Sequence, residues 1–229
     1  MLNNKPQSGN VLFLILIAVA LFAALSYAAT SSMRGGGSDV TSENNLIKSS
    51  TMSQYAASIR TAITRLTVNN RCEITELSFE APPFDGSDSN YVNPSSPADL
   101  SCHIFAPNGG AVSRLPAPQD TNDGRDWAYI EARVLQVGTD QTACGIDCNE
   151  ILLILGGLRK SICEKINDKI LGTTSIVQQD DGANYENKKF IGSFTTGADF
   201  DGAGVNGEYE LCTQDANGVY YYYNVLVAR

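Results

Sequence analysis

The sequence predicts an α+β fold in which an N-terminal membrane helix continues, after a glycine-rich break, into an amphipathic helix packed on a mainly antiparallel sheet. Three patterns support this fold class. Residues Val11–Ala29 form an uncharged apolar run, apolar residues recur at helical spacing between Met52 and Leu66, and two strand-like runs flank the turn signal Asp215–Gly218. One further helix is expected near 149–171.

The apolar run has the length of a membrane-crossing helix. At about 1.5 Å per residue it extends roughly 28 Å, close to the thickness of the hydrocarbon layer. The sequence therefore predicts a transmembrane helix over residues 10–34. Gly35–Gly37 follow it, and because each glycine costs about 1 kcal/mol relative to alanine inside a helix, we expect the helix to break there.

Beyond the glycines, the spacing predicts an amphipathic helix over residues 45–68. The apolar residues that line its inner face are Met52, Tyr55, Ala56, Ile59, Ile63 and Leu66. The best internal strand candidate is Trp127–Val137, and Glu208–Thr213 with Val219–Val227 forms the strongest hairpin signal. Shorter strands are predicted over 72–79, 100–105 and 188–195.

The helix expected near 149–171 has signals at both ends. Asn149 or Asp147 is its candidate N-cap, and Gly172 stands where a helix is expected to end. The apolar residues that line one of its faces are Ile151, Leu152, Leu155, Leu158, Ile162, Ile166 and Ile170.

Composition argues against several classes of function. The chain has 16 Lys+Arg against 25 Asp+Glu, a net charge of -9, which argues against a nucleic-acid partner because phosphates require a basic face. His103 is the only histidine and adjoins Cys102 in a strand-like run, where neighbouring side chains point to opposite faces. Gly202–Gly207 spells GxGxxG, but strand-like residues follow it instead of a helix. We therefore expect no catalytic residues and no enzymatic activity.

The first residues of the chain resemble the leader of a type IV prepilin. The segment Met1–Gly9 is short and polar, carries Lys5, ends in glycine, and directly precedes the apolar run. In that family a dedicated peptidase cuts after the glycine, which implies processing between Gly9 and Asn10. The resemblance includes the pseudopilins of type II secretion, and it covers only the N-terminal leader and helix.

One position departs from the family pattern. The fifth residue of the mature family protein is normally glutamate, and it is Leu14 here. In the family this carboxylate neutralises the amine of a neighbouring subunit inside the filament, where a lone charge is costly. A chain that lacks it is expected to be a poor repeating subunit and a better minor component.

The resemblance and the composition together predict four segments: a prepilin-like leader at 1–9, a transmembrane helix at 10–34, a glycine-rich linker with the amphipathic helix at 35–68, and an extracytoplasmic α+β domain at 69–229. We expect a minor pilin-like or pseudopilin-like envelope protein, a structural or interaction component of a filament or secretion assembly. The expected partners are the membrane bilayer, other pilin-like subunits and the prepilin peptidase. The expected location is the inner membrane, crossed once, with the body in the periplasm or outside the cell. The alternative is a signal-anchored periplasmic module that binds a ligand or calcium outside any filament.

All the cysteines follow the apolar run: Cys72, Cys102, Cys144, Cys148, Cys163 and Cys212. A periplasmic body is expected to hold them as disulfides. Sequence alone does not choose among the many pairings, and the simplest joins Cys72 to Cys102, Cys144 to Cys148 and Cys163 to Cys212. A metal site is the alternative, but the spacing of Cys144 and Cys148 is not that of a standard zinc knuckle.

Two acidic loops have the composition of calcium-binding loops. One of them, at 199–208, offers Asp199, Asp201, Asn206 and Glu208 as oxygen ligands among glycines, and the other spans 120–126. Neither has EF-hand spacing, and the same residue types are typical of ordinary turns. Calcium is the one cofactor that the sequence leaves open.

Overall fold

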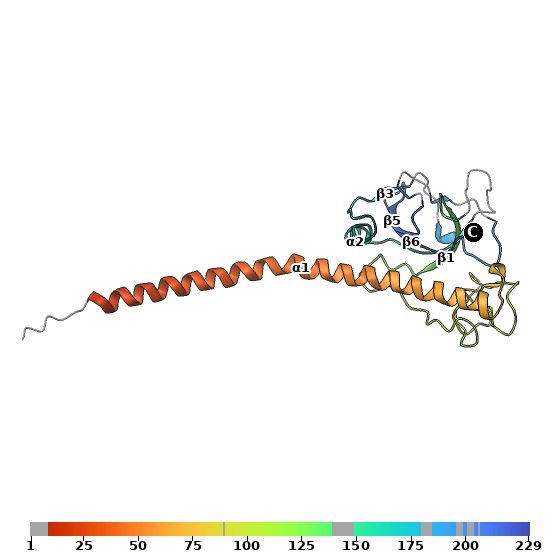
Figure 1. Ribbon diagram of the computed structural model, residues 1–229, viewed down its shortest axis with the longest axis horizontal. Helices are drawn as coiled ribbons and strands as arrows, with labels where there is room; N and C mark the ends of the chain where they lie inside the picture. Colours follow the sequence, from red (N-terminus) through yellow and green to blue (C-terminus); the bar gives the residue numbers. More distant parts are fainter. Residues whose placement is uncertain are drawn as a thin grey trace, which may run out of the picture. The chain divides into compact units, whose positions relative to one another are not determined.

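The computed structural model describes residues 9–88, 90–138, 149–179, 185–195, 199–200, 204–205 and 207–229, without the side chains at 9–11, 29, 31–39, 186 and 199–200. The chain divides into two compact units, Met1–Asn44 and Asn45–Arg229. The described part of the first unit is the N-terminal part of one helix. The second contains the rest of that helix and an α+β body (Figure 1).

Helix α1 runs from Gly9 to Asn69 and belongs to both units. Gly35–Gly37 lie inside it with a helical backbone, so the predicted glycine-rich break is wrong. Glycine lowers helix propensity by about 1 kcal/mol per residue but does not block the backbone hydrogen bonds, whereas long helical segments on both sides favour continuation.

The predicted localisation is also wrong. Across the side chains that the structure describes, no helix is both long and apolar enough to cross a membrane. The expectation of a single-pass inner-membrane protein with a transmembrane helix at 10–34 therefore does not hold.

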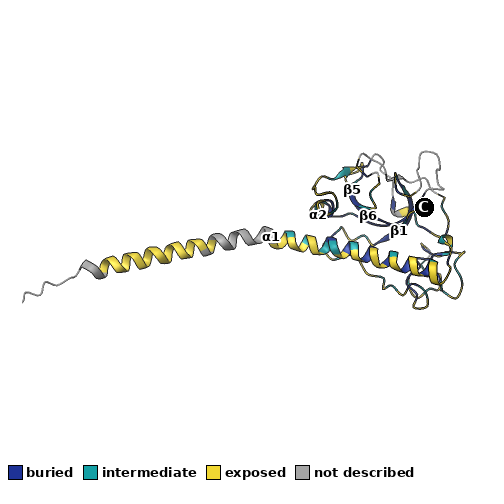
Figure 2. Ribbon diagram, viewed as in Figure 1, coloured by how far each residue is buried: buried dark blue, intermediate teal, exposed yellow. Residues whose placement is uncertain are grey.

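The second-unit part of α1 is amphipathic, as predicted. Its inner face is at most 5% exposed and consists of Met52, Tyr55, Ala56, Ile59, Ala62, Ile63 and Leu66. Figure 2 shows buried and exposed residues alternating along this part of the helix. The buried face joins the main core cluster with side chains from the sheet, including Leu153 and Tyr222. Packing on the sheet therefore stabilises this half of α1.

The sheet is mainly antiparallel, which confirms the predicted α+β class. Its strands are β1 (Ala128–Val134), β2 (Glu150–Gly156), β3 (Val177–Gln178), β4 (Asp199–Phe200), β5 (Glu210–Gln214) and β6 (Tyr220–Val227). They lie in the order β3-β5-β6-β2-β1-β4. Only the short outer pairs β3–β5 and β1–β4 are parallel. The hairpin β5–β6 is the one that the sequence predicts most strongly.

The helix predicted near 149–171 is only partly correct. Residues Glu150–Gly156 form β2 in the middle of the sheet, and helix α2 covers Lys160–Leu171. The apolar run Ile151–Leu155 is buried on both faces of the sheet, which is typical of a central strand and hides the alternation that marks a strand in sequence. Gly172 ends α2 in a left-handed conformation (φ 69°), as predicted.

Two apolar clusters cover the two faces of the sheet. The larger cluster contains side chains from Met52–Leu66 of α1, from α2 and from the segment Cys72–Phe105. The smaller cluster contains Ile130, Leu152 and Tyr223, which lie on the opposite face of the sheet. The strands predicted over 72–79, 100–105 and 188–195 form only isolated bridges, Ser78 to His103 and Lys189 to Ile130. Short 3-10 helices occupy Ile74–Glu76 and Tyr185–Asn187.

Candidate functional site

The described side chains between Leu12 and Ala28 in the first unit are exposed (Figure 2), and nearly all of them are apolar. The large apolar side chains among them are between 41% and 78% exposed: Leu12, Phe13, Leu14, Ile15, Leu16, Ile17, Val19, Leu21, Phe22, Leu25 and Tyr27. We call this set, Leu12–Tyr27, the apolar helix surface. Burying one such side chain fully contributes about 1.5–3 kcal/mol, so the surface gains much from a partner.

The apolar helix surface surrounds the helix. About 3.6 residues make one turn, so the consecutive residues Leu12–Ile17 cover the whole circumference. An amphipathic helix buries one stripe, whereas a helix that is apolar on all sides is typical of one enclosed by several neighbours. Such a surface could support packing against more than one partner helix.

The predicted processing residues lie at the start of α1. The helix begins at Gly9, and the side chains of Gly9 and Asn10 lie outside the described residues, so cleavage between them stays a prediction. Leu14, the residue that departs from the family pattern, belongs to the apolar helix surface and is 59% exposed.

Two disulfides lie in the second unit and match the predicted pairing. Cys72–Cys102 ties the segment after α1 to a loop, with Cα atoms 5.8 Å apart. Cys163–Cys212 ties α2 to β5 across 5.2 Å. Cys144 and Cys148 lie outside the described residues, and their pairing stays a prediction.

The predicted calcium loop is only partly described. Asp201 and Asn206 lie outside the described residues, and Asp199 contributes only its backbone, in β4. Glu208 accepts a hydrogen bond from the Tyr223 hydroxyl at its carbonyl (3.0 Å) and donates its amide to Val205 (3.0 Å). Among the described side chains, no group of three His, Cys, Asp or Glu could hold a metal ion. The calcium site therefore remains a sequence-based prediction.

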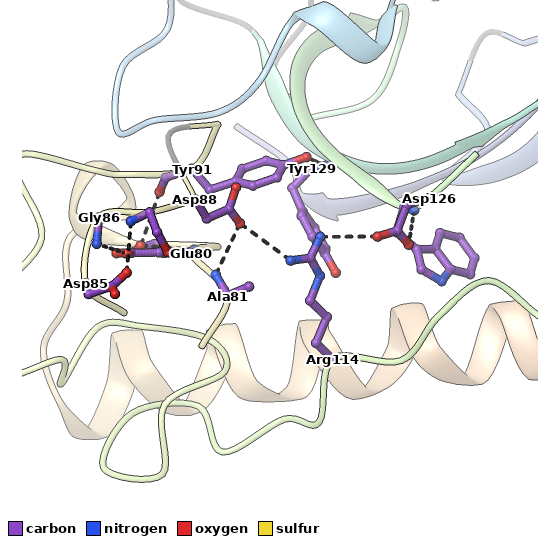
Figure 3. Close-up of polar contacts among 12 residues, drawn as sticks. Glu80, Ala81, Asp85, Gly86, Asp88, Tyr91, Arg114, Asp126 and Tyr129 are labelled. Atoms are coloured by element: carbon purple, nitrogen blue, oxygen red, sulfur yellow. Dashed lines mark hydrogen bonds and ion pairs between the residues drawn. The ribbon is translucent and has the colours of Figure 1, made fainter. Parts of the chain in front are cut away.

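Arg114 joins two loops through carboxylates (Figure 3). Its guanidinium nitrogens lie 3.5 Å from the Asp88 carboxylate and 3.3 Å from the Asp126 carboxylate. Nearby, the Tyr129 amide donates to the Tyr91 hydroxyl (3.1 Å). Burial raises the pKa of both tyrosines, so both remain neutral phenols. The network fastens the loop before Tyr91 to the start of β1.

His103 is buried in a polar cluster of its own. Its Nε2 lies 3.5 Å from Glu80 Oε2, and its Nδ1 lies 3.3 Å from Ser96 Oγ. Burial lowers the pKa of His103 despite the neighbouring Glu80, so the ring is neutral at pH 7. The Glu80 Oε1 atom is engaged by the Gly86 amide (2.7 Å). These contacts satisfy the polar atoms of a buried side chain and hold the loops together.

Two buried carboxylates were not predicted from the sequence. Glu131 in β1, 2% exposed, accepts bonds from the Thr195 amide (2.8 Å) and from Asn149 Nδ2 (3.2 Å). Glu150 at the start of β2 is fully buried, and one of its oxygens accepts from the Val134 amide (2.8 Å), while the other has no partner among the described residues. Burial raises the pKa of Glu150 to about 7. No sequence pattern marks them, because a glutamate within an apolar strand can be either buried or exposed.

A groove of about 440 Å³ runs between α1 and the segment 110–115. Its helix wall contains Ser58, Thr61, Ala62 and Arg65, and no Asp or Glu lines it. The sequence does not predict this groove, because the wall opposite α1 is a loop without a periodic pattern.

Comparison of the chain with protein-family models, with curated proteins and with solved structures finds no match in any of the three. The function is therefore argued from the residues and contacts described above.

Proposed function

We propose that this chain is a minor pilin-like or pseudopilin-like protein, a structural or interaction component of a filament or secretion assembly. The observation that carries the proposal is the exposure of the apolar helix surface, Leu12–Tyr27, on all sides of α1. Water is a poor environment for such a helix, and a bundle of similar helices from other subunits would cover it. No catalytic role is proposed.

The division of α1 between the two units supports this proposal. From Met52 to Leu66 the helix buries one face in the core of the second unit, whereas Leu12–Tyr27 have exposed side chains. One helix thus combines a part that belongs to a folded domain with a part that is suited to intermolecular packing. The resemblance of the N-terminal segment to prepilins implies this same division.

Leu14 supports a minor role. A repeating subunit that pairs a carboxylate with the amine of its neighbour satisfies both charges in an apolar surrounding. This chain has no carboxylate between Met1 and Ala28. It would leave a neighbouring amine unpaired at every repeat, so one or a few copies at a filament end are favoured over a continuous array.

N-terminal sequencing of the protein purified from cells that make it tests this proposal. The expected mature chain begins at Asn10, and a Gly9→Val variant is expected to keep its leader. A wild-type chain that begins at Met1, or a cut that persists in the variant, would contradict the proposal.

The minor role has its own test, the number of copies in isolated filaments. Leu14→Glu supplies the missing carboxylate and is expected to raise the copy number, whereas the uncharged Leu14→Gln is expected to leave it low. Equal copy numbers for Glu and Gln would show that the charge at this position does not limit incorporation.

A further inference from the structure

One wall of the groove beside α1 is the segment 111–115, where some backbone groups are not hydrogen-bonded to other described backbone groups. Ala111 has a left-handed backbone (φ 51°), and exposure alternates over residues 111–115, with Ala111, Ser113 and Leu115 exposed and Val112 and Arg114 half-buried. This period of two is that of a strand with one covered face. Within the described part of the chain, no backbone hydrogen bond involves Ser113 or Arg114. Residues 112–115 therefore share two features with an edge strand, the alternating exposure and the backbone groups of Ser113 and Arg114 that other described backbone groups leave unpaired.

The hydroxyl groups on the helix wall of the groove are already hydrogen-bonded within α1. Ser58 and Thr61 donate their hydroxyl groups to the Tyr55 and Ala57 carbonyls of the same helix (2.7 and 2.9 Å). These side chains therefore present mainly hydrocarbon to the groove. Across from them, Leu115 is 45% exposed, so both sides of the groove contain apolar surface.

The charge of the groove is opposite to that of the chain. Residues 45–72 contain Lys48, Arg60, Arg65 and Arg71 and no Asp or Glu, in a protein of net charge -9. Arg65 lines the groove and is exposed. Its Nη2 donates to the Gly110 carbonyl, which fixes the guanidinium at the groove, and no carboxylate among the described residues pairs with it.

We propose that this groove binds an extended, acidic segment of a neighbouring subunit, which adds as a strand to residues 112–115 and places a carboxylate against Arg65. Backbone hydrogen bonds to the amide and carbonyl of Ser113 would supply affinity, since Ser113 points to the same edge as the Leu115 amide, which donates to Tyr55 of α1. Alternate apolar side chains would contact Leu115 and the hydrocarbon face of α1. Arg65 would select an acidic partner, since an arginine can hold a carboxylate through two parallel hydrogen bonds. The identity of the partner as a subunit rests on the proposed function, whereas the chemistry of the groove does not.

The test uses the full chain and two peptides of alternating glutamate and valine, acetylated and amidated, one of them N-methylated at every residue. The two peptides carry the same side chains and charge, but the methylated one cannot form the ladder of backbone bonds. Fluorescence anisotropy is expected to show binding of the unmethylated peptide and at least about tenfold weaker binding of the methylated one, because two or three hydrogen bonds are lost. Hydrogen exchange is expected to show the Ser113 amide protected only with the unmethylated peptide.

Two charge reversals on α1 give the matched control. Arg65→Glu lies in the groove and is expected to weaken binding about tenfold, since it replaces attraction with repulsion. Arg60→Glu makes the same change outside the groove lining and is expected to alter binding less than about twofold at moderate salt.

Equal binding of both peptides, no binding of either, or equal effects of the two reversals would overturn the inference. These results can be distinguished from the results that test the proposed function. A chain that binds the peptide but starts at Met1 in cells would refute the pilin-like role and keep the groove. A chain processed at Asn10 whose Ser113 amide is never protected would do the reverse.

Discussion

The two parts of helix α1 share a backbone conformation and differ in how they are packed. Between Leu12 and Tyr27 the side chains are apolar in every direction and exposed, whereas between Met52 and Leu66 only one face is apolar and it is buried. The second part owes its helical structure largely to the core that it joins. The first part has no such core within its own unit, which implies that its apolar side chains matter for association and little for the stability of the second unit.

The largest expected effect contrasts two alanine substitutions on this one helix. Ile59→Ala removes a fully buried side chain and is expected to lower the free energy of unfolding of the second unit by about 2–5 kcal/mol. Leu16→Ala, at a site 61% exposed, is expected to change it by less than about 0.5 kcal/mol. Urea unfolding followed by the fluorescence of Trp127, which packs on Tyr55 with ring centroids 5.4 Å apart, measures both. Similar losses for the two variants would contradict the division of α1.

The disulfide between α2 and β5 gives the next effect. Replacing both Cys163 and Cys212 by alanine opens a link between residues 49 positions apart and is expected to destabilise the second unit by roughly 2–4 kcal/mol. The first unit contains no cysteine, so its helix content, measured by circular dichroism, is expected to persist under conditions where the second unit has unfolded. Loss of both signals together would mean that the two units unfold as one.

The smallest effect concerns pH. The proton on Glu150 binds more tightly in the folded chain, where the pKa is about 7, than in the unfolded chain, where it is 4.5. The stability that this protonation contributes is therefore complete below about pH 4.5 and is lost as the pH rises through about 7. In the wild type, the free energy of unfolding of the second unit is therefore expected to decline between pH 4.5 and 8. In Glu150→Gln, which cannot titrate at this position, this decline is expected to be smaller by roughly 1–3 kcal/mol.

Unfolding curves of the wild type and the variant at several pH values check this expectation. Glu164→Gln, on the partly exposed side of α2, is the matched control and is expected to leave the decline in place. An unchanged pH dependence in Glu150→Gln would show that the buried carboxyl is not the cause.

Sequence patterns predict some elements of the molecule and miss others. Apolar spacing identified the inner face of α1 and the β5–β6 hairpin because each has one buried and one exposed side. The same reasoning failed at Ile151–Leu155, since a central strand is buried on both faces and loses the alternation that marks a strand. It also failed at Gly35–Gly37, where propensity alone predicts a break and the helix continues.

The candidate sites show the same limit. Two of the three predicted disulfides are confirmed. They could be predicted because each joins cysteines that follow one another along the chain. The groove beside α1 was not predictable, since it depends on residues 58–65 and 110–115 meeting in space. Glu131 and Glu150 were equally hidden, because a glutamate in an apolar strand has no sequence mark that separates a buried carboxyl from an exposed one.

The most direct test of the account places one charge in each part of α1. Leu16→Glu and Val68→Glu alter apolar residues of similar exposure, 61% and 70%, in the first and second units. The amount of the chain in purified filaments or secretion assemblies is then counted by quantitative mass spectrometry. We predict that Leu16→Glu removes the chain from the assembly because a charge inside a helix bundle is costly, whereas Val68→Glu leaves its amount unchanged. Incorporation of Leu16→Glu at the wild-type level would contradict the claim that Leu12–Tyr27 form the assembly surface.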